Sequence, residues 1–333
     1  MIKGLASLLT PVYNGELYIS VLLDSILNQD YPCIECIIVN DGSSDKTLDI
    51  IDSYREKILR KGYSLQLLNQ ENQGLSSAIN NGLKLVTGEY LIWPDSDDFF
   101  TYSNSISNYV RALKEYNVKV GRCLVNLADE KTKQVIQKSY WLGNTVANLF
   151  EDCLYGKNGF GFFAGSWIIS TDALDKCIAD RNIYTDRTAG QNYQLLLPVL
   201  YNYDCVTIKQ YLYTIVVRNK SLSHENVPNY DKIESRYISY HNSALSALEM
   251  LNNISNTDKK KYKDRVRYKY IYFLFKCAIK YGRYRDANKY RKILTEELKS
   301  HISLKDQILY FFCIFSPYLL LKKISSFFNN LYL

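Results

Sequence analysis

Three carboxylates stand within four residues in Asp95-Ser96-Asp97-Asp98, directly after the apolar run Tyr90-Leu91-Ile92-Trp93 and Pro94. Carboxylates this close repel one another unless a cation or several hydrogen-bond donors compensate their charge. Their oxygens are hard ligands of the kind that Mg²⁺ and Mn²⁺ prefer, and these ions complete their coordination with water and phosphates. Asp95, Asp97 and Asp98 are therefore candidate metal ligands. The alternative for an isolated cluster is a solvated acidic turn or a helix N-terminus.

Three further polar segments precede this cluster, and each follows an apolar run. They are Thr10-Pro11-Val12-Tyr13-Asn14, then Val39-Asn40-Asp41-Gly42-Ser43-Ser44-Asp45, then Asn69-Gln70-Glu71-Asn72-Gln73-Gly74, which leads into Ala78-Ile79-Asn80-Asn81-Gly82. Each segment alone is a weak signal. Their common position after apolar runs indicates a shared site.

Apolar runs and helical patterns alternate through the first hundred residues. Strands are predicted at Leu5–Val12, Ile34–Asn40, Ser64–Leu68 and Tyr90–Trp93, and helices at Glu16–Leu27, Ser44–Leu59 and Ser76–Val86. Ser43 or Ser44 is expected as the N-cap of the second helix. The alternation predicts an α/β fold with a mostly parallel sheet flanked by helices. Because ligands of such sheets bind beyond the carboxyl ends of the strands, the four polar segments are expected to meet around one cleft.

Beyond residue 100 the pattern becomes mixed and then helical. We predict helices at Ser105–Tyr116 and Gln191–Tyr201, and strands at Val118–Leu127, Gln134–Lys138, Phe162–Ile169, Cys205–Tyr213 and Thr214–Arg218. Four helical segments follow, at Tyr230–Leu251, Asp258–Tyr281, Tyr284–Leu298 and from Leu304, with Gly282 as a break. The predicted domains are residues 1–220, which hold the candidate site, and a helical C-terminal region, 221–333.

Charge separates these two regions. Residues 221–333 carry a net charge of +10, whereas residues 1–220 carry −3. The apolar stretch Ile308–Leu321 is too short to span a bilayer, which needs roughly 20 apolar residues. Two alternatives stay open for 304–333, contact with a membrane surface or docking onto the protein itself. A basic run with tyrosines at Lys259–Lys269 could track nucleic acid, but an amphipathic packing helix explains it more simply, and no nucleic-acid partner is predicted.

Eight cysteines occur without a recognisable signal peptide, since Met1-Ile2-Lys3-Gly4 runs directly into a predicted strand. This combination favours reduced thiols in a cytoplasmic protein, without disulfides. Cys33 and Cys36 form a CxxC pair, but no second pair stands at zinc-ligand spacing, which favours small apolar residues at a strand. The spacing motifs of dinucleotide dehydrogenases and of phosphate-transferring ATPases are absent.

The four polar segments, in this order and spacing, closely resemble those of the inverting family 2 glycosyltransferases with the nucleotide-sugar-binding GT-A fold. The resemblance is strong through residues 5–100 and weaker across 160–220. It implies a donor site in which Pro11 and Tyr13 stack on the nucleobase and Asp41 hydrogen-bonds a uracil. Asn72, Gly74, Ala78 and Asn80 match the segment that lines the donor, although Ile79 stands where many relatives have an arginine.

The same resemblance gives roles to the acidic cluster. Asp95 and Asp97 match the pair that contacts the ribose and the metal-bound diphosphate, and Asp98 is a further ligand candidate for Mn²⁺ or Mg²⁺. His224, in the loop after the last predicted strand, is a hypothetical additional ligand, with a solvated loop histidine as the alternative. A metal there would neutralise the charge of the departing nucleoside diphosphate.

The acceptor side departs from its relatives, many of which have a Glu-Asp pair at the start of the acceptor-side helix. Here the aligned residues are Gly190-Gln191-Asn192, and an amide cannot take a proton at neutral pH. Asp186 is the candidate general base, with a turn or helix cap as its alternative. Gln191 and Asn192 could bind acceptor hydroxyls. The aromatic run that ends at Trp167 could form an acceptor wall or fill the core.

Together these features predict a glycosyltransferase that moves a sugar from a nucleotide-diphosphate donor, expected to be UDP-linked, to a saccharide or lipid-linked saccharide of the cell surface. The expected location is the cytoplasm or the inner face of the membrane. A non-catalytic nucleotide-sugar-binding or scaffold protein of the same fold is the alternative, because the base motif is missing. A homodimer through a sheet edge or the C-terminal helices stays open.

Overall fold

A computed structural model of the chain describes residues 1–218 and 229–315 and divides it into two compact units. The first comprises Met1–Glu225 with Ser246–Asn252, and the second comprises Asn226–Leu245 with Asn253–Leu333. No helix within the described ranges is long and apolar enough to cross a membrane. Because His224 falls outside the described residues, its predicted role as a metal ligand is not addressed by the structure.

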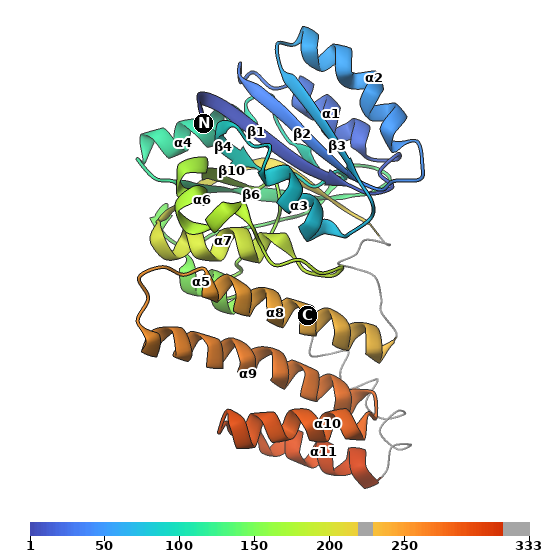
Figure 1. Cartoon of the computed structure of the whole chain (residues 1–333), viewed down its shortest axis with the longest axis vertical. Coiled ribbons are helices and arrows are strands. Elements are labelled where there is room, and N and C mark those ends of the chain that lie inside the picture. The colour runs from blue at the N-terminus through green and yellow to red at the C-terminus, as the bar shows by residue number, and fades with distance from the viewer. Residues whose placement is uncertain (219–228, 316–333) are drawn as a thin grey trace. The chain divides into compact units, whose positions relative to one another are not determined.

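The first unit is built on one mixed sheet in the order β3-β2-β1-β4-β9-β6-β10-β5 (Figure 1). The strands β1 (Ile2–Val12), β2 (Ile34–Asp41), β3 (Ser64–Gln70) and β4 (Gly88–Ile92) run parallel, as the alternating pattern predicts. The short β9 (Trp167–Ser170) runs antiparallel between β4 and β6 (Val120–Asp129). β10 (Cys205–Val217) lies parallel to β6. The predicted α/β class with a mostly parallel sheet is confirmed.

The remaining strands are short. β5 (Phe99–Phe100) and β8 (Val146–Ala147) pair antiparallel with β10, and β7 (Val135–Lys138) pairs antiparallel with β6. Two predictions in this region are wrong. The strand expected from Phe162 begins only at Trp167, because Gly159 and Gly165 adopt left-handed φ values of 65° and 69° that interrupt extended backbone. The two strands expected at 205–218 are one strand, with register irregularities between Ile208 and Tyr213.

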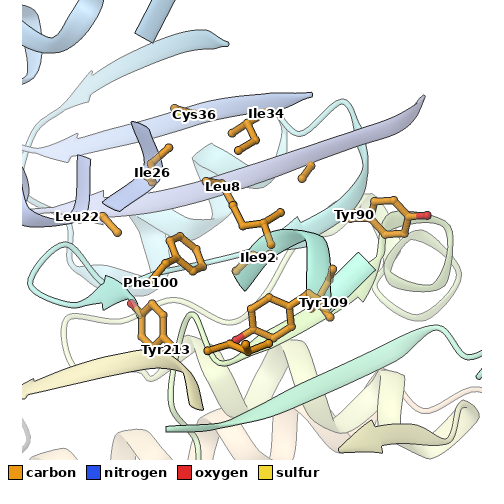
Figure 2. Close-up of a cluster of buried hydrophobic side chains, with 14 of the residues drawn as sticks. Leu8, Leu22, Ile26, Ile34, Cys36, Tyr90, Ile92, Phe100, Tyr109 and Tyr213 are labelled. Carbon is orange, nitrogen blue, oxygen red and sulfur yellow. The ribbon is translucent and has the colours of Figure 1, made fainter. Parts of the chain in front are cut away.

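Helices cover both faces of the sheet. One face packs on α1 (Ile19–Leu27), α2 (Thr47–Arg60) and α4 (Ser105–Glu115). Side chains that alternate along the strands, such as Leu8, Cys36 and Ile92, meet helix residues such as Leu22 and Ile26 in this core (Figure 2). This burial is the main source of stability of the unit.

The other face carries α3 (Leu75–Leu83), α6 (Thr171–Cys177) and α7 (Gln191–Asn202), with the short α5 (Phe150–Tyr155) beside α7 (Figure 1). Gly82 allows α3 to approach β1 closely, because a Cβ there would lie 2.1 Å from Leu9 Cδ1. A single 3-10 turn follows α6 at Ala179–Arg181. The helices on this face bring the segment 182–192 toward the carboxyl ends of β1 to β4.

The N-cap expected for α2 at Ser43 or Ser44 is wrong. The helix begins at Thr47, whose amide donates to Asp45 Oδ1 at 3.0 Å, and the amide of Lys46 donates to Glu16 Oε2 at 3.0 Å. Ser43 instead accepts a hydrogen bond from the preceding strand's loop. Two carboxylates therefore satisfy amides at the start of this helix, where the helix dipole favours negative charge.

The second unit is helical. It contains α8 (Tyr230–Glu249), most of which belongs to this unit, α9 (Asn256–Lys280), α10 (Tyr284–Lys292), a π-helical turn at Ile293–Glu297 and α11 (Leu304–Phe315). Its core contains Leu274, Phe275, Ala278, Ala287 and Leu294. Gly282, with a φ of 66°, separates α9 from α10 as predicted, and Ser255 caps α9 by accepting the amide of Asp258 at 3.0 Å.

Candidate functional site

The loops after β1 and β2 are joined by hydrogen bonds. The amide of Asn14 donates to Ser43 Oγ, and the amide of Ser44 donates to Asn14 Oδ1, both at 2.9 Å. Asn14 has a left-handed φ of 49°, a conformation that asparagine tolerates better than most residues. Tyr13 projects from this joined rim with 54% of its surface exposed, whereas Pro11 is buried in β1 beside Val39. Tyr13 is thus the freer of the two predicted base-stacking side chains.

Asp41, the predicted uracil contact, holds the loop between β3 and α3. Its Oδ1 accepts hydrogen bonds from Gln70 Nε2 at 2.8 Å and from the amide of Gln73 at 2.9 Å, and its Oδ2 accepts from the amide of Gly74 at 2.9 Å. The residue is only 4% exposed. A buried carboxylate with three donors is strongly fixed, because hydrogen bonds to an ionised acceptor are the stronger kind. Asp41 therefore fixes the conformation of the loop that carries Asn72.

Gly74 lies close to the backbone of the segment that contains Asp186 and Arg187. Its φ is 92°, and a Cβ there would lie 3.2 Å from the Cα and from the carbonyl oxygen of Arg187. Ser76 Oγ donates to the carbonyl oxygen of Asp186 at 3.2 Å. A glycine is required here for two reasons: the positive φ disfavours other residues, and a Cβ would crowd the backbone of Arg187. Asn72 is half-buried, and its amide lies 2.8 Å from where a Cβ of Gly42 would stand.

Asn80 is buried and holds α3 against the segment that begins at Asn182. Its Nδ2 donates to Asn182 Oδ1 at 2.8 Å and to the carbonyl oxygen of Ile183 at 2.9 Å, while its Oδ1 accepts the amide of Ile183 at 2.8 Å. Ala78 and Ile79 are fully buried beside it. Asn80 is only 8% exposed, so these contacts occupy it. It ties α3 to the 182–187 segment about a hundred residues later in the chain.

Asp186, the candidate general base, lies on that segment. Its Oδ1 accepts from the amide of Thr188 at 2.7 Å and from its hydroxyl at 3.2 Å, and its Oδ2 accepts from Tyr184 Oη at 3.1 Å. These contacts are those of a turn residue, the alternative expected from the sequence. The hydrogen bonds of its own turn thus occupy both oxygens of the Asp186 carboxylate.

The acidic cluster lies at the end of β4, where the predicted metal ligands come together with an arginine. The Asp97 carboxylate forms an ion pair with Arg218, which follows β10. Asp98 Oδ1 accepts the amide of Val216 at 2.9 Å. Within the described residues, the half-buried Asp95 carboxylate accepts no hydrogen bond. The three carboxylates therefore differ in how their charge is compensated.

The pKa values reflect this difference. Burial raises the pKa of Asp95 to about 7, and the charge of Asp97 adds to the rise while Arg218 opposes it. Burial and the charges of Asp97 and Asp95 also raise the pKa of Asp98 well above its usual range, despite the hydrogen bond from Val216. Both groups lack sufficient positive charge nearby. A cation bound here would supply it.

These residues fit a hard divalent cation. In the described part of the chain no three His, Cys, Asp or Glu side chains form a complete metal site by themselves. Mg²⁺ and Mn²⁺ sites, however, commonly use one or two carboxylates with phosphate oxygens and water. Asp95 and Asp98 have the uncompensated charge and the oxygen donors that such an ion needs, whereas Asp97 already faces Arg218.

The start of α7 forms the other side of the site. Asn192 Oδ1 accepts Trp93 Nε1 at 2.6 Å, and Asn192 Nδ2 donates to the carbonyl oxygen of Phe162 at 2.7 Å. Gln191 precedes it and is 4% exposed. Trp167 is fully buried, with its ring 5.2 Å from that of Phe160. Trp167 therefore lies in the core, which is the alternative expected from the sequence.

Arg218 is a site residue that sequence reasoning did not assign. Its guanidinium lies 4.5 Å from the centre of the Tyr18 ring, and Tyr18 Oη donates to Glu130 Oε1 at 2.9 Å. Tyr18 comes from the start of α1 and Glu130 from the end of β6, so distant segments position this cation. The only signal in the sequence is that Arg218 ends the last predicted strand, Thr214–Arg218.

Comparison with known proteins agrees with this architecture. A sequence model described as glycosyl transferase family 2 matches residues 7–178. An uncharacterized glycosyltransferase of Rickettsia typhi is 40% identical over 130 residues, which are 38% of this chain and 38% of that protein. The putative glycosyltransferase EpsH of Bacillus subtilis is 44% identical over 93 residues, 28% of this chain and 26% of that protein. The chain thus matches well under half the length of these relatives.

Solved structures share the fold over nearly the whole chain. Staphylococcus aureus TarS 1-349 in complex with UDP-GlcNAc superposes with a TM-score of 0.66 at 16% identity, over 98% of this chain and 92% of that one. A mannosyltransferase of Pyrobaculum calidifontis, in complex with GDP-Man and Mn²⁺, gives a TM-score of 0.53 at 14% identity, over 94% and 86%. The fold is GT-A, with a helical C-terminal region. Because the family model spans more than half of its residues, the chain belongs to glycosyl transferase family 2.

Proposed function

We propose that this protein transfers a sugar from a nucleotide-diphosphate donor, UDP-linked, to a saccharide or lipid-linked saccharide acceptor in the synthesis of cell-surface polysaccharide. One observation carries the proposal: Asp95 and Asp98, at the carboxyl end of β4, are carboxylates with too little positive charge around them. A divalent cation together with a nucleoside diphosphate would suit such a site, because the cation would supply the positive charge that the two carboxylates and the diphosphate lack. Family membership supports the reaction class.

In this proposal the residues at the site divide into two groups. Tyr13 stacks on the nucleobase, since its ring is exposed on the rim formed by the first two loops. Asp95 and Asp98 hold Mn²⁺ or Mg²⁺, which would stabilise the charge of the leaving diphosphate. Asp41, Gly74 and Asn80 keep the surrounding loops in place rather than contacting the donor themselves.

Inversion at the anomeric carbon would require a group that removes the proton of the acceptor hydroxyl. Asp186 remains the candidate, although its carboxylate already accepts hydrogen bonds from Thr188 and Tyr184. It would act after those contacts rearrange on acceptor binding. Gln191 and Asn192 lie at the N-terminus of α7. Because Asn192 is bonded to Trp93 and Phe162 and Gln191 is buried, they would orient acceptor hydroxyls only after these contacts rearrange.

Calorimetric titration with UDP, with and without Mn²⁺, tests the donor site. We expect UDP-selective binding over GDP, CDP and ADP that Mn²⁺ strengthens and that Asp95→Asn weakens at least tenfold. Asp129→Asn is a matched control, because Asp129 accepts bonds only within its own turn at Thr132 and Lys131. If no nucleotide binds the folded protein in either condition, the transferase proposal is wrong.

The alternative of a non-catalytic nucleotide-sugar-binding protein has one observation in its favour, the engagement of Asp186 together with the amides at Gln191 and Asn192. Acceptor-dependent release of UDP from UDP-sugars separates the two functions. A protein that binds UDP with metal but releases none from any UDP-sugar, across a panel of saccharide acceptors, is the non-catalytic form.

We further propose that the C-terminal region contacts the membrane surface. Leu304, Ile308 and Phe311 lie at helical spacing on α11 and are 73%, 48% and 57% exposed. The net charge of +10 in residues 221–333 complements anionic lipid headgroups. Sedimentation with anionic and with neutral vesicles tests this. Binding to anionic vesicles should fall on Ile308→Glu, whereas equal partition with both vesicle types would contradict it.

A further inference from the structure

Arg122 is a buried cation that forms no ion pair within the described residues. The residue is 7% exposed on β6, and its Nη2 has no hydrogen-bond partner in the part of the chain that the structure describes. Its Nε donates to Thr207 Oγ1 at 3.1 Å. No described carboxylate lies within ion-pair distance of the guanidinium. Burial lowers the pKa of Arg122, and the charge of the more distant Asp152 opposes this fall only in part. A desolvated charge of this kind is unfavourable unless something compensates it.

Three aromatic rings surround the guanidinium. Its central carbon lies 4.1 Å from the centre of the Trp141 ring, 5.7 Å from that of Phe160 and 5.6 Å from that of Trp167. Cation–π contacts of this kind fix the guanidinium in place. They do not satisfy its remaining N–H groups, which still require an acceptor. The rings therefore position Arg122 and leave one end of its fork without a partner.

Trp141 is the cover of this arrangement. It is half-buried, and its indole Nε1 donates only to the carbonyl oxygen of Asn144 in its own loop, at 3.0 Å. Its neighbours Tyr140 and Leu142 are 76% and 90% exposed. Hydrogen bonds from Ser139 to Val125 and from Thr207 to Thr145 anchor the two ends of this loop, and between them the Trp141 ring covers the guanidinium. Displacement of that one ring would open a path from solvent to Arg122.

Arg122 lies on the acceptor side of the sheet. It pairs with Trp167 across β6 and β9, and the β4–β9 pairing, continued by two residues, places Trp93 at the same level. Directly opposed residues in antiparallel strands share a face, so all three point toward α7. Two strand spacings, roughly 10 Å, separate Arg122 from β4. The carboxylate cluster lies further along the strand direction, because Asp98 accepts the amide of Val216, and Val216 is paired with Ala128, roughly 20 Å along β6 from Arg122.

We propose that Arg122 binds an anionic group, a phosphate or a carboxylate, of an acidic glycan acceptor, and that Trp141 moves aside to admit it. Arginine suits this task, since its planar fork pairs with either anion through two parallel hydrogen bonds. The charge is already desolvated and held by the rings, so an anion would meet a preorganised cation in a water-poor setting. The inference deepens the proposed transferase function and rests on it for the identity of the ligand as an acceptor.

Fluorescence gives a direct test in the full chain without donor or turnover. Trp93 and Trp167 are fully buried, so displacement of Trp141 should dominate any change in acrylamide quenching. Glycerol phosphate and glucuronate serve as the phosphate and carboxylate probes, with glycerol and glucose as neutral controls. We expect saturable, increased quenching with at least one charged probe and none with its neutral counterpart. A response to neither charged probe, or an equal response to the neutral ones, overturns the proposal.

Two variants distinguish the role of the Arg122 charge from that of the Trp141 ring. Arg122→Met keeps a similar shape without the charge and should reduce binding of the charged probe at least tenfold by calorimetry. Trp141→Phe should lose the fluorescence response while it retains binding within about threefold. Unchanged probe binding in Arg122→Met refutes the proposal. If Arg122→Met does not fold, Arg122→Lys replaces it and should still weaken binding, because a point charge lacks the fork.

Binding of UDP with Mn²⁺ by the same variants distinguishes this inference from the proposed function. Arg122→Met should bind UDP as wild type does, which also shows that it is folded. Failure of UDP binding in the wild type would overturn the transferase proposal and with it the identity of the ligand as an acceptor, whereas the anion site itself would still be judged by the probes. Loss of probe binding with normal UDP binding supports the assignment of Arg122.

Discussion

Replacement of Asp95 by asparagine should stabilise the metal-free protein at alkaline pH while it damages the site. In the folded protein burial raises the pKa of Asp95 to about 7, whereas the unfolded chain loses this proton near the ordinary value of about 3.9. Between these two pH values the folded state holds a proton that the unfolded state has released. The free energy of unfolding therefore falls as pH rises through this window. Asparagine, which does not titrate, removes this fall.

The size of the effect follows from the same numbers. The difference between about 3.9 and about 7, at about 1.4 kcal/mol per pKa unit, gives a ceiling of roughly 4 kcal/mol above pH 7. Asp95 is only half-buried, and solvent screening reduces this figure, so we expect about 1–3 kcal/mol. For a unit of this size, that stabilisation corresponds to a rise in melting temperature of about 2–10 °C.

Melting curves of Asp95→Asn and of the wild type at pH 4, 6 and 8, in the presence of a chelator, measure this stabilisation. Trp93, Trp141 and Trp167 all lie in the first unit, so tryptophan fluorescence follows its unfolding. The variant and the wild type should be close at pH 4 and diverge as pH rises. A variant that is no more stable than the wild type at pH 8 would mean that the folded protein compensates the Asp95 charge by another route, and our reasoning about the cluster would be refuted.

Asp172→Asn is a control of opposite sign. Burial alone would raise the pKa of Asp172. Hydrogen bonds from Ser170 and Lys119, together with the nearby lysine charges, nevertheless keep this pKa below its ordinary value. This carboxylate contributes stability that is present above the unfolded pKa and is lost as pH falls through the folded value. Its replacement should therefore destabilise the protein at pH 8, and the difference should shrink in acid.

Three further substitutions test the contacts around the site. Gly74→Ala should cost about 1–3 kcal/mol of stability, since alanine disfavours its φ of 92° and the added carbon meets the backbone of the opposite loop; chemical denaturation measures this, and UDP should bind more weakly. Asn192→Ala should cost about 1–2 kcal/mol because it leaves the buried Trp93 Nε1 without an acceptor, and a shifted emission maximum would report the change. Arg218→Ala leaves Asp97 without its ion pair, so Mn²⁺ titrated without nucleotide should bind at least threefold more tightly; unchanged Mn²⁺ affinity would show that Asp97 lies outside the metal's reach.

The sequence by itself determined the order of elements in the part of the chain that carries the candidate site, from β1 to β4. Alternation of apolar runs with helical patterns placed β1 to β4 and the three helices between them, with deviations of a few residues at their ends. Parallel strands buried on both faces read as continuous apolar runs, and the right-handed connection rule then leaves few ways to arrange them. The family assignment rests on the same stretch, since the loops that carry its motifs follow these strands.

Tertiary structure alone decided which side chains face the site and which support it. Asp41 and Asn80 stand in motif positions, yet their hydrogen bonds brace loops, and the partners of Asn80 lie about a hundred residues away. Arg218 reaches Asp97 only because β10 runs beside β5 and β6 at the end of the sheet. Arg122 appears in the sequence as an ordinary charged residue of a predicted strand. Periodicity reports local geometry and burial, whereas pairing between segments distant in the sequence depends on how the whole sheet assembles.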